Sequence, residues 1–124
     1  MKTKQVIVMK KFSQLRTGKY CAQAAHASLG AFLNCYTLME INPKVDTILN
    51  EWLYDSFIKI VLYVETDEEL IDLYQKCLDA GIPNSLITDN GTTEFNGVPT
   101  TTALGIGPWE VEELDKITGE LKLF

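Results

Sequence analysis

The chain has 124 residues, of which 46% are hydrophobic and 23% charged, and its formal net charge at pH 7 is −6. These values are ordinary for a soluble globular protein and predict a single domain over residues 1–124. No apolar run reaches the roughly 18–20 residues that cross a bilayer, and the first apolar stretch is too short for a signal peptide, so we expect a cytoplasmic protein without a membrane partner.

The charges are distributed unevenly along the chain. Residues 1–39 contain six basic and no acidic side chains, whereas residues 40–124 carry a net charge of −12. A cationic segment on an acidic body attracts polyanions to one face only, which favours a nucleic-acid partner. The alternative is that the asymmetry has no function.

The cysteines and the single histidine argue against disulfide and metal chemistry. Cys21, Cys35 and Cys77 are odd in number and have no CxxC spacing, which is typical of free or buried thiols in a cytosolic protein. With one histidine and no cysteine cluster, a metal site would have to be built from carboxylates. We therefore expect no metal.

The first half of the chain predicts a strand followed by two helices. Residues 6–9 form a short β-rich run, and a helix is expected from about 18 to 40, with Ser13 or Thr17 as its N-cap. Pro43 fits the first turn of a second helix that ends near residue 54. That helix carries an apolar stripe at i, i+3, i+4 and i+7 spacing, formed by Val45, Ile48, Leu49 and Trp52.

The middle of the chain predicts a second strand and a third helix. Residues 58–64 read as the strand. Thr66 and Glu69 have the spacing of a capping box, and Gly81 is placed to end the helix that begins there. The buried side of this helix is expected to consist of Leu70, Leu73, Tyr74, Cys77 and Leu78.

The last third predicts two strands, at residues 85–88 and 101–106, and a short acidic helix that Pro108 opens and that runs to about Lys116. The two strands are separated by too few residues for a parallel crossover, so we expect an antiparallel pair and a mixed sheet. Strands alternating with helices indicate an α/β fold with helices on both faces of a small sheet. The long polar segment 89–99 is of the kind that often carries function.

The first helix has a polar face among small residues. At about 100° per residue, Lys19, Gln23 and His26 fall within about 60° of one another. The surrounding alanines allow a neighbouring element to approach closely. We expect the chemistry of the protein on this face.

Three blocks of sequence carry a family resemblance. The first is Gly18-Lys19 with Ala22-Gln23 and His26-Ala27, and the second is residues 59–62, an acidic helix start and residues 80–83. The third joins Asp89, Gly91 and Thr93 to residues 104–108 and 115–119. In this order and spacing they resemble the type 2 peptidyl-tRNA hydrolases, the archaeal and eukaryotic kind, over essentially the whole chain.

The resemblance implies a three-layer α/β/α fold around a four-stranded mixed sheet in the order 2-1-4-3, with the fourth strand antiparallel. Family members cleave the ester that joins a nascent peptide to the 3′ end of tRNA. They need no metal or organic cofactor and are often dimers, so tRNA and a second copy of the chain are the partners to expect.

Carried over residue by residue, the family's functional lysine, glutamine, histidine and aspartate correspond to Lys19, Gln23, His26 and Asp89. The threonine of the family's Gly-Arg-Thr-Gln loop corresponds to Thr93, and the threonine of its last strand to Thr102. The resemblance therefore implies that His26, Asp89, Lys19 and Thr93 are catalytic and that Gln23 and Thr102 bind substrate.

Two hypotheses for the base remain open. His26 accepts the proton of water while Asp89 holds its other ring nitrogen, or Asp89 polarises the water while His26 orients it. Lys19 holds the 3′-terminal phosphate or the oxyanion from the first turn of its helix. Lys10, Lys11 and Arg16 are expected to contact phosphates of the acceptor stem.

The sequence departs from the family in the loop that contains Thr93. The family's Arg-Thr-Gln is here Thr92-Thr93-Glu94, so that a cation is lost and a negative charge gained beside the site. This departure favours an alternative function, that of a catalytically weak homologue that binds tRNA or protein. A third hypothesis is a related hydrolase of smaller substrates.

Overall fold

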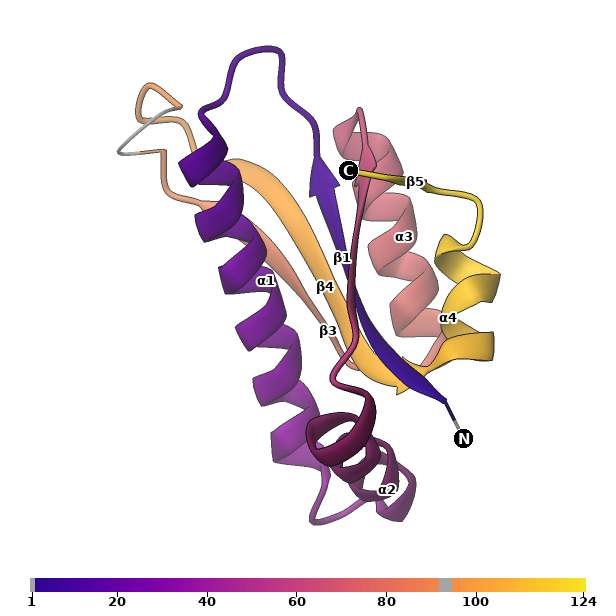
Figure 1. Ribbon diagram of the computed structural model, residues 1–124. Coiled ribbons are helices and arrows are strands. Elements are labelled where there is room, and N and C mark those ends of the chain that lie inside the picture. Colours follow the sequence, from indigo (N-terminus) through magenta and orange to yellow (C-terminus); the bar gives the residue numbers. More distant parts are fainter. Residues whose placement is uncertain (1, 92–94) are drawn as a thin grey trace.

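The computed structural model describes residues 2–91 and 95–124, and its strands form one mixed sheet between two layers of helices (Figure 1). In chain order the elements are β1 (Thr3–Lys10), α1 (Thr17–Leu38), α2 (Pro43–Glu51), the π-helical turn η1 (Trp52–Ser56), β2 (Lys59–Val64), α3 (Asp67–Ala80), β3 (Asn84–Asp89), β4 (Thr100–Glu110), α4 (Val111–Thr118) and β5 (Lys122–Leu123).

The strands lie in the order β3-β4-β1-β2-β5. β1 and β2 are parallel, whereas β4 is antiparallel to both β1 and β3. The predicted mixed α/β class and the antiparallel pairing of the third and fourth strands are confirmed. The predicted number of four strands is wrong, because Lys122 and Leu123 pair with Tyr63 and Leu62 and add β5 to the edge of the sheet.

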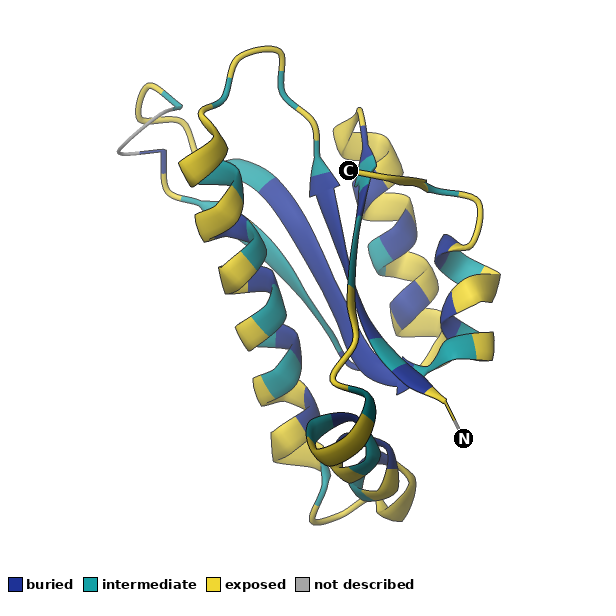
Figure 2. Ribbon diagram, viewed as in Figure 1, coloured by how far each residue is buried: buried dark blue, intermediate teal, exposed yellow. Residues whose placement is uncertain are grey.

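Helices cover both faces of the sheet, with α1 and α2 on one side and α3 and α4 on the other (Figure 1). Side chains alternate between the faces along each strand. Ile7 and Met9 of β1 therefore pack with Ala27 of α1, whereas Val6 and Val8 belong to the larger cluster that includes residues of α3 and α4. Figure 2 shows the buried residues running through the central strands and along the helix sides that face them.

Small residues let α1 lie close to β4. A Cβ at Gly105 would overlap the carbonyl oxygen of Ala27 and lie 3.1 Å from the Cβ of Ala31. The buried residues of α1 recur every fourth position, at Gln23, Ala27, Ala31 and Cys35. Gln23 is the one residue of this set with a polar side chain, and it faces the sheet near the start of the helix.

The predicted N-cap of α1 is wrong, whereas that of α3 is confirmed. Neither Ser13 nor Thr17 caps α1, because the helix begins at Thr17 itself and the N-cap position falls on Arg16, which makes no capping hydrogen bond through its side chain. α3 begins as predicted, with the Thr66 hydroxyl accepting from the backbone N–H of Glu69 at 3.1 Å. The stripe predicted for the second helix is buried, although Trp52 lies in η1 and not in α2.

Pro108 does not open a helix. It lies inside β4, and the last helix starts at Val111, three residues later than predicted. Proline cannot donate to a strand ladder and is tolerated at bulges. The pairing of β1 with β4 shifts register between Lys4 and Val6, opposite Pro108, and then continues to the pair of Thr3 with Glu110.

Two further predictions concern side chains of the helices. Leu78 is 48% exposed, so its predicted burial in α3 is wrong, whereas Leu70, Leu73 and Cys77 are buried. The cysteines are free thiols, as expected, and burial raises the pKa of both Cys35 and Cys77 to about 12. Among the residues described, no helix is both long enough and apolar enough to cross a membrane.

Candidate active site

The candidate site is centred on Asp89, the last residue of β3. Its Oδ1 accepts hydrogen bonds from Lys19 Nζ at 2.9 Å and from Gln23 Nε2 at 3.3 Å, both from the start of α1. Its Oδ2 accepts from the backbone N–H of Gly91 at 2.8 Å. The start of α1 and the end of β3 thus meet at one carboxylate, although the bonded residues are 66 and 70 positions apart in the sequence.

The surroundings of Asp89 favour its ionised form. The Lys19 and Asp89 side chains are only 14% and 11% exposed. The hydrogen bond from Lys19 and that from Gly91, together with the positive charge of Lys19 and the Gln23 amide, lower the pKa of the carboxyl, and they outweigh the opposing effect of burial. At neutral pH the site therefore contains a carboxylate.

Gln23 connects this carboxylate to β4. It is 1% exposed, and its Oε1 accepts a hydrogen bond from the hydroxyl of Thr102 at 2.6 Å while its Nε2 donates to Asp89. A buried amide must satisfy its polar atoms within the protein. Gln23 therefore has one orientation available, with its oxygen toward Thr102 and its nitrogen toward Asp89.

A β-bulge explains how Thr102 reaches α1. Ala103 packs against Ala27 of α1, so strict alternation would turn Thr102 to the opposite face. The pairing of β3 with β4 steps from Ile87–Ala103 to Thr88–Thr101, which leaves Thr102 without a partner on β3. Such an extra residue re-aims side chains, and here the Thr102 hydroxyl points to Gln23.

The N-terminus of α1 adds positive potential at this point. Lys19 lies in the first turn, no side chain caps the helix start, and the first turn contains no acidic residue. Backbone N–H groups at a helix start favour an anion. The site can therefore stabilise negative charge beside the carboxylate.

Gly91 belongs to the third block of the family resemblance, and its backbone N–H also contributes to the site by donating to Asp89. Its φ is +82°, and a Cβ there would lie within 2.6 Å of the backbone nitrogen of Val98. Asp-x-Gly is the pattern of an aspartate that caps the backbone two residues ahead. That pattern was a usable signal for the Gly91–Asp89 hydrogen bond.

His26 lies apart from this network. It is exposed, and among the described residues it makes no hydrogen bond or ion pair. The shared face of Lys19, Gln23 and His26 was predicted from their angles around the helix axis alone. Lys19 and His26 are seven residues apart, which separates them by about 10 Å along the axis. Lys19 and Gln23 reach Asp89 from the start of α1, whereas the hypothetical hydrogen bond from His26 to Asp89 is not present in the described structure.

The flank of α1 that carries His26 faces the edge strand β3. Further along the same flank, a Cβ at Gly30 would lie 3.0 Å from the Cβ of Ser85, and Asn34 Nδ2 donates to the Asn84 carbonyl at 2.6 Å. By the i, i+4 spacing of a helix, His26 continues this row toward the end of β3 where Asp89 lies. The imidazole is thus open to a ligand that approaches along this edge.

Of the remaining predicted residues, Lys10, Lys11 and Arg16 lie in the stretch from the last residue of β1 to the N-cap of α1. Thr93 lies outside the described residues. Lys10 forms an ion pair with Asp67 at 2.7 Å, Lys11 is exposed and lies over the ring of Tyr63, and Arg16 is exposed at the N-cap of α1. Within residues 2–91 and 95–124, no group of three or more histidine, cysteine or acidic side chains could hold a metal ion.

Comparison with known proteins identifies the family. The family described as "Peptidyl-tRNA hydrolase PTH2" matches residues 3–124. The chain belongs to this family. A protein named peptidyl-tRNA hydrolase from Methanopyrus kandleri is 43% identical over 120 residues, which cover 97% of each chain. Proteins of the same name from Nanoarchaeum equitans and Methanocaldococcus jannaschii are 41% and 40% identical over 97–98% of each chain.

Proposed function

We propose that the network around Asp89 is the active site of a peptidyl-tRNA hydrolase, which cleaves the ester bond of peptidyl-tRNA and releases free tRNA and peptide. One observation carries this proposal. In this member of the peptidyl-tRNA hydrolase family, the ionised carboxylate of Asp89 lies at the start of α1. It accepts hydrogen bonds from Lys19, Gln23 and the Gly91 N–H.

Asp89 orients the attacking water. Its two oxygens offer about four acceptor positions, and three described donors use three of them. The remaining position, on Oδ2, can accept a hydrogen bond from water. Because its pKa is lowered, Asp89 is a weak base, and its role is to hold the water and not to keep its proton.

His26 moves the proton. An imidazole suits proton transfer near neutral pH, and this one is exposed on the flank of α1 that leads to Asp89. The oxygen of water attacks the ester carbonyl carbon, the bond to the ribose 3′ oxygen breaks, and the proton taken from water is returned to that oxygen. His26 acts once the substrate bridges it to the water at Asp89.

Lys19 stabilises the oxyanion that forms on the carbonyl oxygen. The Lys19 side chain is 14% exposed and extends from the first turn of α1. In many enzymes, charge that is fixed in position before the reaction in a partly dehydrated site makes the largest single contribution to the rate enhancement. Gln23 and Thr102 keep Asp89 in position, and the family resemblance implies a catalytic role for Thr93.

Binding of tRNA depends on cations beside this site. Lys10 is the last residue of β1, Lys11 follows it and Arg16 precedes α1. Lys10 is paired with an aspartate whose side chain is 59% exposed. An exposed pair of this kind is weak, so phosphate can replace the carboxylate. Three further expectations about this protein stay predictions. These are that it acts in the cytoplasm, that it forms a homodimer and that it is a single domain.

A binding module without efficient catalysis is the second candidate. It is favoured by Thr92 and Glu94, which replace the arginine and glutamine of the family's loop. Loss of a cation and gain of an anion in this loop weaken the attraction of tRNA phosphates.

Release of free tRNA from N-acetylaminoacyl-tRNA tests the proposal. We expect turnover by the wild type, a loss of kcat/KM of at least about 100-fold in Lys19→Ala and of at least about tenfold in His26→Ala. Lys4→Ala is the matched control, because Lys4 pairs with Asp115 at 2.7 Å on the far side of the sheet from α1; it should stay within about twofold of the wild type.

Each other outcome selects a different function. Intact substrate at high enzyme concentration would overturn the enzyme and favour the binding module. Equal turnover of a small N-acetylaminoacyl ester and of the full tRNA substrate would favour a small-substrate hydrolase.

A further inference from the structure

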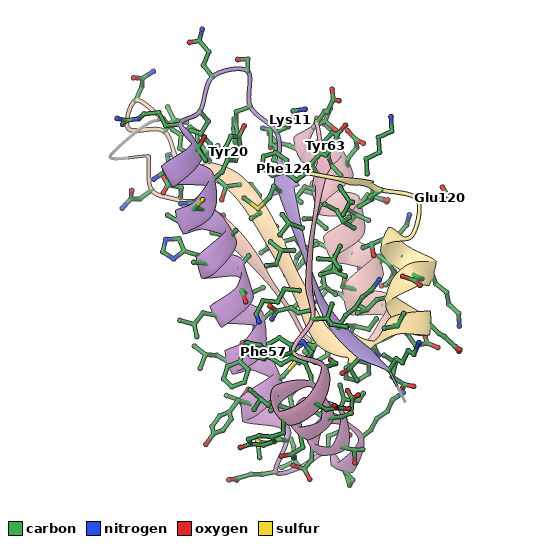
Figure 3. The ribbon with its side chains drawn as sticks, in the orientation of Figure 1. Lys11, Tyr20, Phe57, Tyr63, Glu120 and Phe124 are labelled. Atoms are coloured by element: carbon green, nitrogen blue, oxygen red, sulfur yellow. The ribbon has the colours of Figure 1, made fainter. Side chains whose placement is uncertain are left out.

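A row of aromatic side chains leads away from Lys19 across the end of the molecule where β1 ends. We call it the aromatic row, and its members in spatial order are Phe95, Phe12, Tyr20, Phe124 and Tyr63. Neighbouring ring centroids are 4.9–6.4 Å apart. Figure 3 shows Tyr20, Tyr63 and Phe124 gathered at this end with Lys11.

Lysines accompany the row along its length. Lys19 Nζ lies 5.9 Å from the centre of the Phe95 ring, Lys10 Nζ lies 4.9 Å from that of Phe12, and Lys11 Nζ lies 4.6 Å from that of Tyr63. Lys10 and Lys19 also have carboxylate partners. Lys11 has none among the described residues.

A depression opens beside Phe12 in the row. It has a volume of about 450 Å³ and is lined by Lys11, Phe12, Ser13 and Glu65. This volume lies in the range of small-molecule sites. The depression therefore presents a cation, an aromatic ring, a hydroxyl and a carboxylate within one concave surface.

Phe12 is held in place from α1. The Tyr20 hydroxyl accepts a hydrogen bond from the Phe12 backbone N–H at 2.8 Å and donates to the Phe12 carbonyl at 3.2 Å. The ring of Phe12 also contacts those of Tyr20 and Phe95. A ring fixed in this way loses little conformational freedom when a ligand stacks on it.

We propose that this depression is a nucleotide subsite, which binds one of the unpaired nucleotides at the 3′ end of the tRNA. The base stacks on Phe12, the phosphate binds Lys11, and a ribose hydroxyl donates to Glu65. The proposal rests on the proposed function, because that function places the ester, and so the 3′ end, beside Lys19 and Asp89.

The chemistry of the depression favours a nucleotide over the side chain of a peptide. Bases stack on aromatic side chains with little dependence on sequence, at about 1–3 kcal/mol per base. Lysine provides the phosphate contact, and a carboxylate that accepts from a ribose hydroxyl distinguishes RNA from DNA. An apolar peptide side chain would use the ring alone and leave Lys11 and Glu65 without a role.

The kinetic test uses the full chain and N-acetylaminoacyl-tRNA. Phe12→Leu should raise KM about tenfold and leave kcat within twofold, Phe12→Tyr should restore KM, and Lys11→Ala should raise KM and weaken its dependence on salt. Phe57→Leu is the matched control, since Phe57 is 54% exposed, has Lys59 Nζ 3.2 Å from its ring centre and lies at the other end of the molecule (Figure 3). Its KM should equal that of the wild type.

The same series of variants distinguishes loss of the subsite from a folding defect and from binding of a peptide side chain. Lys11→Ala and Glu65→Gln leave the contacts between the rings in place, so they test the subsite even if Phe12→Leu lowers the melting temperature. Unchanged KM in Lys11→Ala and in folded Phe12→Leu would overturn the subsite and leave the hydrolase in place. A KM change that varies with the amino acid on the tRNA, and not with its 3′ nucleotides, would also overturn it.

A binding experiment decides the subsite without turnover. The probe is the trinucleotide CCA, as RNA and as DNA, titrated into wild type, Phe12→Leu and Glu65→Gln. We expect the wild type to bind RNA more tightly than DNA, Phe12→Leu to weaken both about tenfold, and Glu65→Gln to weaken RNA only. Equal binding by wild type and Phe12→Leu would overturn the subsite, whether or not the wild type hydrolyses its substrate.

Discussion

Two lysine–aspartate pairs of this protein have nearly the same geometry and very different surroundings. Lys19 and Asp89 lie 2.9 Å apart, and Lys4 and Asp115 lie 2.7 Å apart. The Asp89 side chain is 11% exposed, whereas that of Asp115 is 51% exposed. The Asp89 carboxylate also accepts from Gln23 and from a backbone N–H, whereas among the described residues only Lys4 donates to the Asp115 carboxylate.

The comparison shows that an ion pair alone does not make a site. An exposed pair such as Lys4–Asp115 contributes about 0–1 kcal/mol, because water competes for both charges. At Asp89 the additional donors fix the carboxylate and lower its pKa, and partial burial keeps the Lys19 ammonium beside it. Charge that is fixed in position before the reaction is what hydrolysis requires.

Neutralising the two aspartates tests the comparison most strongly. Asp89→Asn should lower kcat/KM for N-acetylaminoacyl-tRNA by about 10²–10³-fold, because the amide cannot hold Lys19 and the water as a carboxylate does. Asp115→Asn should change it by less than about twofold. Equal losses in the two variants would contradict a special role for the surroundings of Asp89.

The fold was predictable from sequence where local patterns are strong. The apolar runs of the first four strands, Pro43, the Thr66–Glu69 capping box and Gly81 each place an element boundary. β5 was missed because two residues give no periodicity, and its pairing depends on β2, about 60 residues earlier in the chain. Pro108 was misassigned because a proline after glycine marks a helix start and a bulged strand equally well.

The site was predictable only in part, because contacts between elements that are distant in sequence leave no local pattern. Helical spacing correctly placed Lys19 and Gln23 together, since both lie in the first two turns of α1. Spacing gives an angle but not the position of β3 along the helix, so it brought His26 into the same face without showing its distance from Asp89. The bulge that turns Thr102 to Gln23 depends on the pairing of β3 with β4, which no local pattern encodes.

Removing the buried amide should have an intermediate effect. Gln23→Met keeps the side-chain volume but takes a donor from Asp89 and an acceptor from Thr102. We expect a loss of about 1–3 kcal/mol in the free energy of unfolding, since the Thr102 hydroxyl is left buried without its partner. Because Asp89 keeps Lys19, activity should fall less than in Asp89→Asn.

A double-mutant cycle isolates the hydrogen bond between the two side chains. Thr102→Val should cost about 1 kcal/mol by itself, and the double variant should cost less than the sum of the single ones, with a coupling of about 0.5–1.5 kcal/mol. Urea denaturation measures all three variants. Additive losses would show that Gln23 and Thr102 act independently.

The smallest effect is expected in the pH dependence of stability. The pKa of Asp89 is lowered below its ordinary value of 3.8, so the folded state holds the carboxylate charged at pH values where the unfolded chain begins to bind a proton. This stabilisation is complete above the unfolded pKa and is lost as the pH falls through the folded pKa. The stability gap between wild type and Asp89→Asn should therefore be flat from about pH 7 to about pH 5 and shrink as the pH falls through the ordinary value of 3.8 toward the folded pKa. Urea denaturation at several pH values measures this gap; a gap that already narrows between neutral pH and about pH 5 would require a raised pKa, and Lys19 and the Gly91 N–H could not then be the groups that determine the charge of Asp89.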